Sequence, residues 1–415
     1  MRFKPRREVR VRVELVTPQF GGGAEVRVVD VDQWLRPSAV RGALRFWWRA
    51  RHAHDFKDVR GMHDAERAIF GSAGDSKSGG PGLISVCVEC DPPLSKPGPF
   101  EPRAGDAMSG AYFPAQSFGG DAACLLPPNA TATIVVRAVE EMSDADWSDA
   151  QKSLRMFLLM GGSGARTRRA AGALVVADAP SATKIDFPRT TKDMESVFRD
   201  LPSSSRTHGI FTLAAHEAVY LRMFPGAEPA HRELLETWRR LRQDREHPGG
   251  WKGSSGWGRT RWPEADAIRL LHHTHARWED RTTHAPDAAN AGKAPRAHLG
   301  LPIVVKFKDD RTTVRHRERG TLERPDPRKS EIVVDDTHDR YASPVMLSVA
   351  VLHDNPANER FAAIALVTRS ELKGPVKLRG RADRLSPGDW NDVSKRVHKT
   401  FSDAGFQRIA PEHTR

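Results

Sequence analysis

Residues 35–52, LRPSAVRGALRFWWRARH, predict the helix around which the rest of the fold is organised. At ~100° per residue, as in an α-helix, the apolar side chains of this stretch fall on one continuous arc. The arc consists of Val40, Ala43, Leu44, Phe46, Trp47 and Ala50, with Trp48 at its border; Arg41, Arg45, Arg49 and His52 lie on the opposite side. Pro37 and Ser38 suit the first turn of a helix. We therefore expect a helix whose apolar arc packs on a sheet.

Segments on either side of this helix predict the strands of that sheet. Apolar and charged residues alternate in EVRVRVELVT (8–17), which is typical of a half-buried strand. Further strands are expected in LISVCVEC (83–90), ATATIVVRAV (130–139) and GALVVAD (172–178), and a second helix in 143–162. This order is β-α-β-β-α-β, the ferredoxin-like arrangement shared by RNA-recognition modules.

The second half of the chain predicts another α+β unit of similar kind. We expect strands near 210–215, 302–308, 344–352 and 361–368, and helices near 229–246, 263–275 and 389–403. A length of 415 residues suits roughly two domains. The predicted fold class is therefore α+β, with two ferredoxin-like (RRM-like) domains carrying inserted helices and loops. We place them at residues 1–180 and 181–415.

Composition narrows the class of protein. The formal net charge is +12, and arginine, whose guanidinium binds phosphate in bidentate fashion, outnumbers lysine. Three cysteines exclude a disulfide scaffold, and Cys87 and Cys90 point to opposite faces of a predicted strand, so we expect no metal. No run approaches the ~20 apolar residues of a membrane span. The first residues lack the apolar segment of a signal peptide, so we expect a cytoplasmic protein without a membrane partner.

Arginines of the first predicted helix form the first candidate RNA-binding site, which consists of Arg36, Arg41, Arg45 and Arg49. No acidic residue stands three or four positions away within the stretch, whereas solvated helix faces usually mix charges. The alternatives are a solvated face and a phosphate contact. Whether the arginines are solvated or bind phosphate, replacing Arg41, Arg45 and Arg49 by alanine is expected to remove three positive charges and no atoms of the core.

Two glycine-marked stretches form the second and third candidate sites. In GGSGARTRRAAGAL (161–174), the glycines are expected to let consecutive backbone N–H groups line an anion site. Its candidate residues are Gly162, Gly164, Arg166, Arg168 and Arg169. GGWKGSSGWGRTRWPEADAIR (249–269) alternates tryptophans with cations, which suits base stacking; its candidates are Lys252, Arg259 and Arg261. The alternative for residues 161–174 is a helix C-cap followed by a basic loop without a ligand. The alternative for residues 249–269 is a loop that simply packs against its domain.

Together these stretches resemble the RAMP superfamily of CRISPR-associated proteins, most closely the first-numbered subunit of type III-B (Cmr) effector complexes. The resemblance rests on TPQFGGGAE (17–25), LRPSAVRGALRFWWRA (35–50), IFGS (69–72) and the glycine-rich loop 161–174. It continues in GWGRTRWPEADAIR (256–269), HLGLPIVVKF (298–307) and RYASPVMLSV (340–349). Ala170 stands where the RAMP pattern favours glycine.

The resemblance implies a subunit of a crRNA-guided complex that destroys foreign RNA in antiviral defence. In that family the subunit lies at the head of the complex, by the 3′ end of the crRNA. Its implied partners are crRNA, target RNA and other Cmr subunits. The subunit of that family is not regarded as the nuclease, so no catalytic residue is implied, and no cofactor or metal is expected. Such complexes read sequence by guide–target pairing, while their protein subunits hold backbone and shape.

Two other functions remain open from the sequence. Some RAMP relatives cleave RNA without metal through His or Tyr, and His208 and the histidines of HHTH (272–275), His272, His273 and His275, are the candidates here. Alternatively, the basic surface binds an acidic protein neighbour and the chain is a purely structural cap. RNA binding separates the cap from the other two functions, and RNA cleavage identifies the enzyme.

Overall fold

The computed structural model describes residues 7–72, 80–102, 108, 112, 122–177, 185–204, 210–244, 260–272, 286–306, 329–335, 337–338, 340–355 and 358–409. The chain forms two compact units. Unit 1 comprises Met1–Trp238, Val345–Thr368 and Ser402–Arg415, and unit 2 comprises Arg239–Pro344 and Arg369–Phe401. This division differs from the expected boundary at residue 180.

The first sheet of unit 1 contains the strands expected around the first helix. Its order is β3-β6-β1-β7, with antiparallel neighbours, and its strands are β1 (Glu8–Leu15), β3 (Ile84–Cys90), β6 (Thr131–Ala138) and β7 (Leu174–Val176). Helix α1 (Pro37–His52) follows β1, and α4 (Asp144–Met160) follows β6. Ser143 caps α4 by accepting a hydrogen bond from the Asp146 amide. The β-α-β-β-α-β order predicted for this part of the chain is confirmed.

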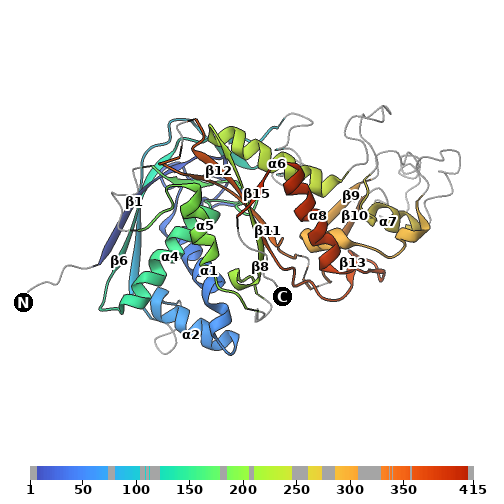
Figure 1. Ribbon diagram of the computed structural model, residues 1–415, viewed down its shortest axis with the longest axis horizontal. Coiled ribbons are helices and arrows are strands. Elements are labelled where there is room, and N and C mark those ends of the chain that lie inside the picture. The colour runs from blue at the N-terminus through green and yellow to red at the C-terminus, as the bar shows by residue number, and fades with distance from the viewer. Residues whose placement is uncertain are drawn as a thin grey trace, which may run out of the picture. The chain divides into compact units, whose positions relative to one another are not determined.

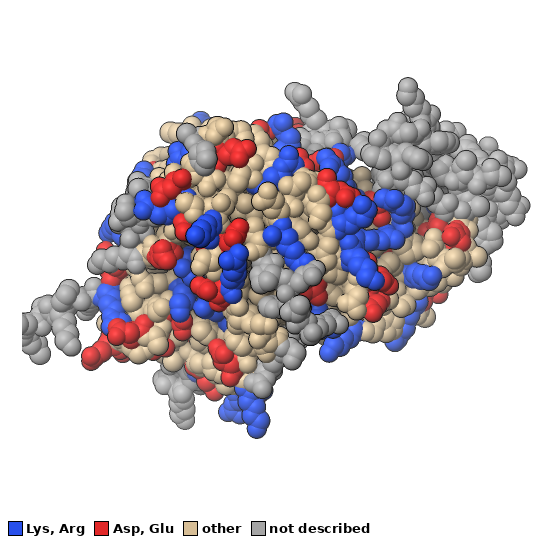
Figure 2. Space-filling view, in the orientation of Figure 1, with Lys and Arg blue, Asp and Glu red and all other residues tan. Residues whose placement is uncertain are grey.

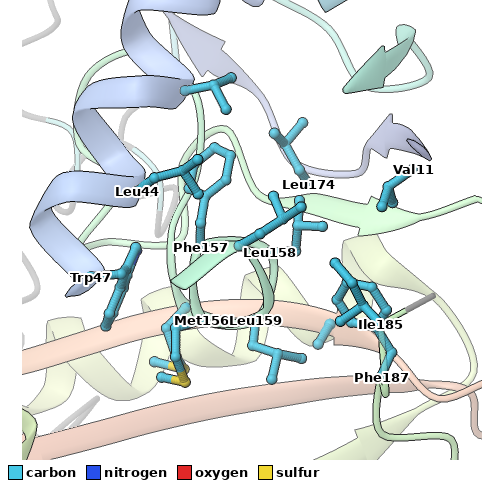
Figure 3. Packing of buried hydrophobic residues seen from close by; sticks show 14 of the residues in the cluster. Val11, Leu44, Trp47, Met156, Phe157, Leu158, Leu159, Leu174, Ile185 and Phe187 are labelled. Atoms are coloured by element: carbon cyan, nitrogen blue, oxygen red, sulfur yellow. The ribbon is translucent and has the colours of Figure 1, made fainter. Parts of the chain in front are cut away.

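The apolar sides of α1 and α4 bury the core on this sheet (Figures 1 and 3). Leu44 and Trp47 of α1 lie beside Phe157 of α4, and only 2% of Trp47 is exposed. Trp48, expected at the border of the arc, is also buried, because Phe56 and His52 pack against its ring. The apolar arc is therefore wider than the sequence predicts.

A second sheet of unit 1 repeats the strand order of the first. It consists of β8 (His216–Phe224), β11 (Val345–Val351), β12 (Phe361–Thr368) and β15 (Gln407–Arg408), in the antiparallel order β11-β12-β8-β15. Helix α6 (Ala227–Gln243) follows β8, and α8 (Trp390–Asp403) precedes β15. In both sheets the second strand along the chain is outermost, followed by the third, the first and the fourth. The strand expected at 210–215 begins only at His216, because Leu213–Ala215 forms a 3-10 helix, η4.

One hydrophobic core joins the two sheets of unit 1. Val11 and Leu174 of the first sheet belong to the same buried cluster as Met346 and Ile364 of the second. In Figure 3, Met156 of α4 points toward β11 and β12, the strands of residues 345–368. A boundary at 180 would cut this cluster, so the units of the structure divide elsewhere.

Further elements of unit 1 are short or lie outside the two sheets. They are α2 (Val59–Phe70), α5 (Thr191–Arg199), the 3-10 helix η1 (Ala53–Asp55), and the small sheet of β2 (Gln19–Phe20), β5 (Cys124–Leu126) and β4 (Gly98–Pro99). Thr190 and Asp193 form a capping box at the start of α5. Cys87 and Cys90 lie on β3, as expected, and Cys90 packs its thiol toward the Leu35 carbonyl oxygen.

Unit 2 has its own sheet and core. Its strands are β9 (Ile303–Lys306), β10 (Lys329–Val333), β13 (Val376–Leu378) and β14 (Arg384–Leu385), in the antiparallel order β14-β13-β10-β9. Helix α7 (Glu264–His272), the 3-10 helices η6 (Ala288–Asn290) and η7 (Pro295–Leu299), the end of α6 and most of α8 also belong to unit 2. Its buried cluster includes Ile268, Ile332 and Val376. In the part of the chain that the structure describes, no helix has the length and apolar character of a membrane span.

Candidate nucleic-acid interface

The arginines of α1 find their acidic partner on the next helix. Arg49 donates to the Glu66 carboxylate of α2 at 2.6 Å, and Arg45 binds the same oxygen. The Glu66 side chain is 0% exposed, and those of Arg45 and Arg49 are each 29% exposed. Arg41 donates to the carbonyl oxygen of Phe70, where α2 ends. The stripe is thus a half-buried network, and the expectation that its loss removes no core contact is wrong.

The two arginines keep the buried Glu66 carboxylate in its ionised form. Burial alone would raise the pKa of Glu66, but hydrogen bonds from Arg49 and Arg45 outweigh it and hold that pKa below its ordinary value. Glu66 is separated from Arg49 by 17 residues and from Arg45 by 21, so no helix-spacing rule connects them. Arg36, the N-cap residue of α1, makes no side-chain capping bond. RNA contact by these four arginines remains a prediction.

The glycines of loop 161–173 allow close backbone packing. A Cβ on Gly162 would lie 2.7 Å from the Gly172 oxygen, and one on Gly164 would lie 2.6 Å from the Phe20 oxygen. Gly164 also has a φ of +79°, which favours glycine. The amide of Ser163 donates to Gly172 at 2.8 Å and that of Ala165 donates to Phe20 at 2.8 Å. The predicted anion site would need consecutive backbone N–H groups that are free to bind a ligand. The amides of Ser163 and Ala165 are instead used within the protein.

The far end of this loop ties the two sheets of unit 1 together. Thr17 donates its hydroxyl to the Ala170 oxygen at 2.6 Å, next to the first sheet. The Ala170 amide donates to the Leu347 oxygen on β11 at 3.1 Å, and the Leu347 amide returns a bond of 3.1 Å to Arg168. Ala170 has a φ of +59°, a left-handed conformation that costs an ordinary residue ~1–2 kcal/mol. Glycine would adopt this conformation freely.

Three arginines of the loop have different surroundings. Arg166 is exposed. Arg168 places its guanidinium carbon 5.5 Å from the centre of the Phe46 ring and 5.0 Å from that of Phe211. Arg169 lies 3.8 Å from the Trp238 ring centre and donates to the Val345 oxygen at 2.8 Å. Arg169 therefore holds the fold together, Arg168 is half-buried over the two rings, and Arg166 lies at the surface.

The third basic stretch falls mostly outside the described residues. Lys252 and Arg259 lie there, together with Trp251 and Trp257. Arg261 pairs with Asp244, with 2.9 Å between Nε and the carboxylate oxygen. Trp262 is buried and donates its indole N–H to the Leu241 oxygen at 2.7 Å. The described end of the stretch is thus packed within unit 2, and its role toward RNA remains a prediction.

A buried tyrosine–histidine pair supports the glycine-rich loop. Tyr112 donates its hydroxyl to the Arg169 oxygen at 2.8 Å and lies 2.7 Å from Nε2 of His231. Because the single hydroxyl proton serves Arg169, His231 is the donor to the tyrosine oxygen. Burial lowers the pKa of His231 to about 4 and raises that of Tyr112 well above its ordinary value. Both groups are neutral at pH 7, and burial separates them from any bound RNA.

The histidines proposed for an enzyme are not placed by the structure. His208, His273 and His275 lie outside the described residues, and only the backbone of His272 is described, at the end of α7. His52 binds Asp55 at 3.0 Å and approaches Asp149 at 3.4 Å. No group of three or more histidine, cysteine or acidic residues among the described ones is arranged to hold a metal ion.

The open face of the first sheet differs from that of RNA-recognition modules that stack bases on aromatic rings. On this face Arg10 pairs with Glu89 at 3.2 Å and Arg12 with Asp91 at 2.8 Å. Arg137 binds Glu8 across the neighbouring strands. Figure 2 shows basic and acidic side chains interspersed over one side of the molecule. The sheet face is therefore a mixed-charge surface, and α1 with the glycine-rich loop is the better candidate interface.

Two solved structures are similar to this chain over most of its length. Cmr1 from Pyrococcus furiosus in its apo form is 13% identical, with a TM-score of 0.48, covering 98% of this chain and 99% of that one. A chain of the type III-B Cmr-β complex bound to cognate target RNA is 10% identical, with a TM-score of 0.45, covering 95% of this chain and 99% of that one. No curated protein matches the sequence.

A family match covers the part of the chain that contains the candidate interface. Residues 12–175 match the RAMP superfamily, a range that includes α1 and the glycine-rich loop. The resemblance recognised in the sequence is confirmed by this match. Residues 12–175 of this chain are thus similar to the RAMP superfamily.

Proposed function

We propose that this protein is a non-catalytic, RNA-binding subunit of a crRNA-guided type III-B (Cmr) CRISPR effector complex. In this role it lies at the head of the complex, by the 3′ end of the crRNA, and helps engage target RNA together with other Cmr subunits. The RAMP match over residues 12–175 and the resemblance of the motifs along the chain support this assignment. The repeated strand order of the two sheets supports two ferredoxin-like halves within unit 1.

One observation carries the RNA-binding role. The glycine-rich loop leaves Arg166 exposed and Arg168 partly exposed, and Arg168 lies beside α1. Guanidinium groups bind phosphate oxygens through parallel hydrogen bonds and stack on bases. The net charge of +12 adds a sequence-independent attraction for RNA.

We expect the isolated protein to bind single-stranded RNA with a strong salt dependence. Each phosphate contact on a single strand adds about −0.7 to the slope of log affinity against log salt. Arg166→Ala and Arg168→Ala should therefore each make the slope shallower by about 0.7 for two unrelated RNA sequences. The measurement is the dissociation constant over a salt series, with Arg12→Ala on the open sheet face as the control. Affinity that hardly changes with salt would contradict RNA binding.

We also expect the purified protein not to cleave RNA. This expectation rests on the sequence, in which His208 and the histidines of residues 272–275 form no coherent set with a tyrosine or a carboxylate. The measurement follows end-labelled RNA during incubation with and without a chelator. Cleavage that disappears in His208→Ala or His272→Ala would instead establish the metal-independent ribonuclease.

A further inference from the structure

Two phenylalanines beside the glycine-rich loop form a partly exposed aromatic pair. Phe46 of α1 and Phe211, shortly before η4, stack with ring centres 5.4 Å apart and planes inclined by 19°. Both rings meet the buried Trp47 edge-on, at 5.1 and 6.4 Å between centres. The core below therefore holds the pair in position, while part of each ring stays at the surface.

Arg168 lies over both rings of this pair. Its distances of 5.5 and 5.0 Å from the ring centres are within the ~6 Å range of cation–π contacts. The Leu347 amide fixes the Arg168 backbone by donating to its carbonyl oxygen at 3.1 Å. A positive, planar group is thus held beside aromatic surface, which is the combination that binds unpaired nucleotides.

The adjoining surface of α1 is open. Gly42 is one turn before Phe46 on the helix and is exposed, and among the described residues no atom outside its own stretch of helix lies within 4 Å of the position where its Cβ would stand. Glycine inside a helix is less favourable than alanine, because it loses more conformational freedom on folding. No packing contact explains that cost here. The small size of Gly42 leaves room beside Phe46. Arg49, three residues after Phe46, lies on the same side of α1.

We propose that Phe46, Phe211 and Arg168 form a stacking site for one unpaired RNA base, with the strand passing Gly42. This inference rests on the proposed RNA-binding function and adds a contact to the base itself. Stacking tolerates every base because each has a π-face, so the site holds single-stranded RNA without reading its sequence. Arg168 contributes charge to the same nucleotide.

The experiment compares single-stranded RNA with an abasic ribose-phosphate strand of equal length. We expect the wild-type protein to bind the RNA about 5- to 100-fold more tightly, as stacking of one base predicts. Phe46→Leu and Phe211→Leu should remove most of this difference and leave the salt slope unchanged, because no charge is lost. Arg168→Ala should instead make the slope shallower. Phe224→Leu is the matched control, because Arg222 lies 5.1 Å from the Phe224 ring centre at another site.

A tryptophan reporter keeps the test independent of leucine variants that fold poorly. Phe46→Trp preserves an aromatic ring, and its fluorescence should be quenched by RNA and not by the abasic strand. If neither strand binds to the wild-type protein, the proposed function fails. If both bind equally with a steep salt slope, the function holds and the stacking site is overturned. If the leucine variants bind RNA normally yet fail to join a Cmr complex, the rings contact a protein neighbour instead.

Discussion

Replacing Arg45 and Arg49 together by alanine is expected to lower the free energy of unfolding by about 3–5 kcal/mol, because a buried carboxylate loses its partners. Glu66 has no exposed side-chain surface and receives hydrogen bonds from both arginines. Without them, the His63 ring stays 3.2 Å from the other carboxylate oxygen, but burial would raise the pKa of Glu66, and its charge would lack both arginine partners. Equilibrium denaturation of the variant and the wild type at pH 7 measures this loss.

Two control variants distinguish the stability lost when a buried carboxylate loses its partners from the stability lost when positive charges are simply removed. Arg10→Ala with Arg12→Ala also removes two positive charges, but these side chains are 49% and 44% exposed, so the cost should stay within roughly 1 kcal/mol for each pair. Replacing Arg45, Arg49 and Glu66 together by methionine removes the buried charge with its partners and should recover much of the lost stability. A double-alanine variant as stable as the wild type would show that Glu66 does not depend on the two arginines.

Acid should weaken the same network. Because the folded pKa of Glu66 is lower than its ordinary value of 4.5, its ionised form is favoured by folding. This contribution is present above the unfolded pKa and is lost as the pH falls through the folded pKa. Glu66→Gln should accordingly show a smaller loss of stability below about pH 4 than the wild type.

Trp47→Ala is expected to cost about 3–5 kcal/mol of unfolding free energy, because it leaves a cavity at the contact between α1 and the core. Trp47 touches Phe46 and Phe211 and is 2% exposed. Chemical denaturation checks this value. Val28→Ala serves as the control, because Val28 is 42% exposed and its change should stay within about 0.5 kcal/mol. Equal effects of the two substitutions would contradict the placement of Trp47 in the core.

The expected stability losses of the Arg45, Arg49 and Trp47 variants affect how RNA-binding measurements on such variants are interpreted. Loss of RNA affinity in an Arg45 or Arg49 variant would mix unfolding with lost phosphate contacts. Arg166 is exposed and Arg168 is partly exposed, and both lie outside the Glu66 network, so their substitution tests binding more directly. The choice between the basic sites therefore follows from burial, which the sequence pattern of α1 does not reveal.

Short-range patterns in the sequence determined the elements of the first sheet. Alternation in residues 8–17 predicted β1, and helical spacing predicted α1 with Leu44 and Trp47 in the core. These patterns succeed because side-chain direction repeats every 2 or 3.6 residues within a single strand or helix. The motifs within residues 17–72 and 161–174 likewise predicted the similarity to the RAMP superfamily over residues 12–175.

Contacts between distant residues were decided only by the tertiary structure. Glu66, the partner of Arg45 and Arg49, is on another helix. Strand β8 pairs with β12, which lies far along the chain, and Phe211 stacks on Phe46 although a long stretch of sequence separates them. No local period connects such residues, because chain folding brings them together through burial of a shared core. The sequence by itself determined where the helices, strands and basic residues lie along this chain. Burial and pairing in three dimensions decided which arginines stabilise the fold and which remain at the surface.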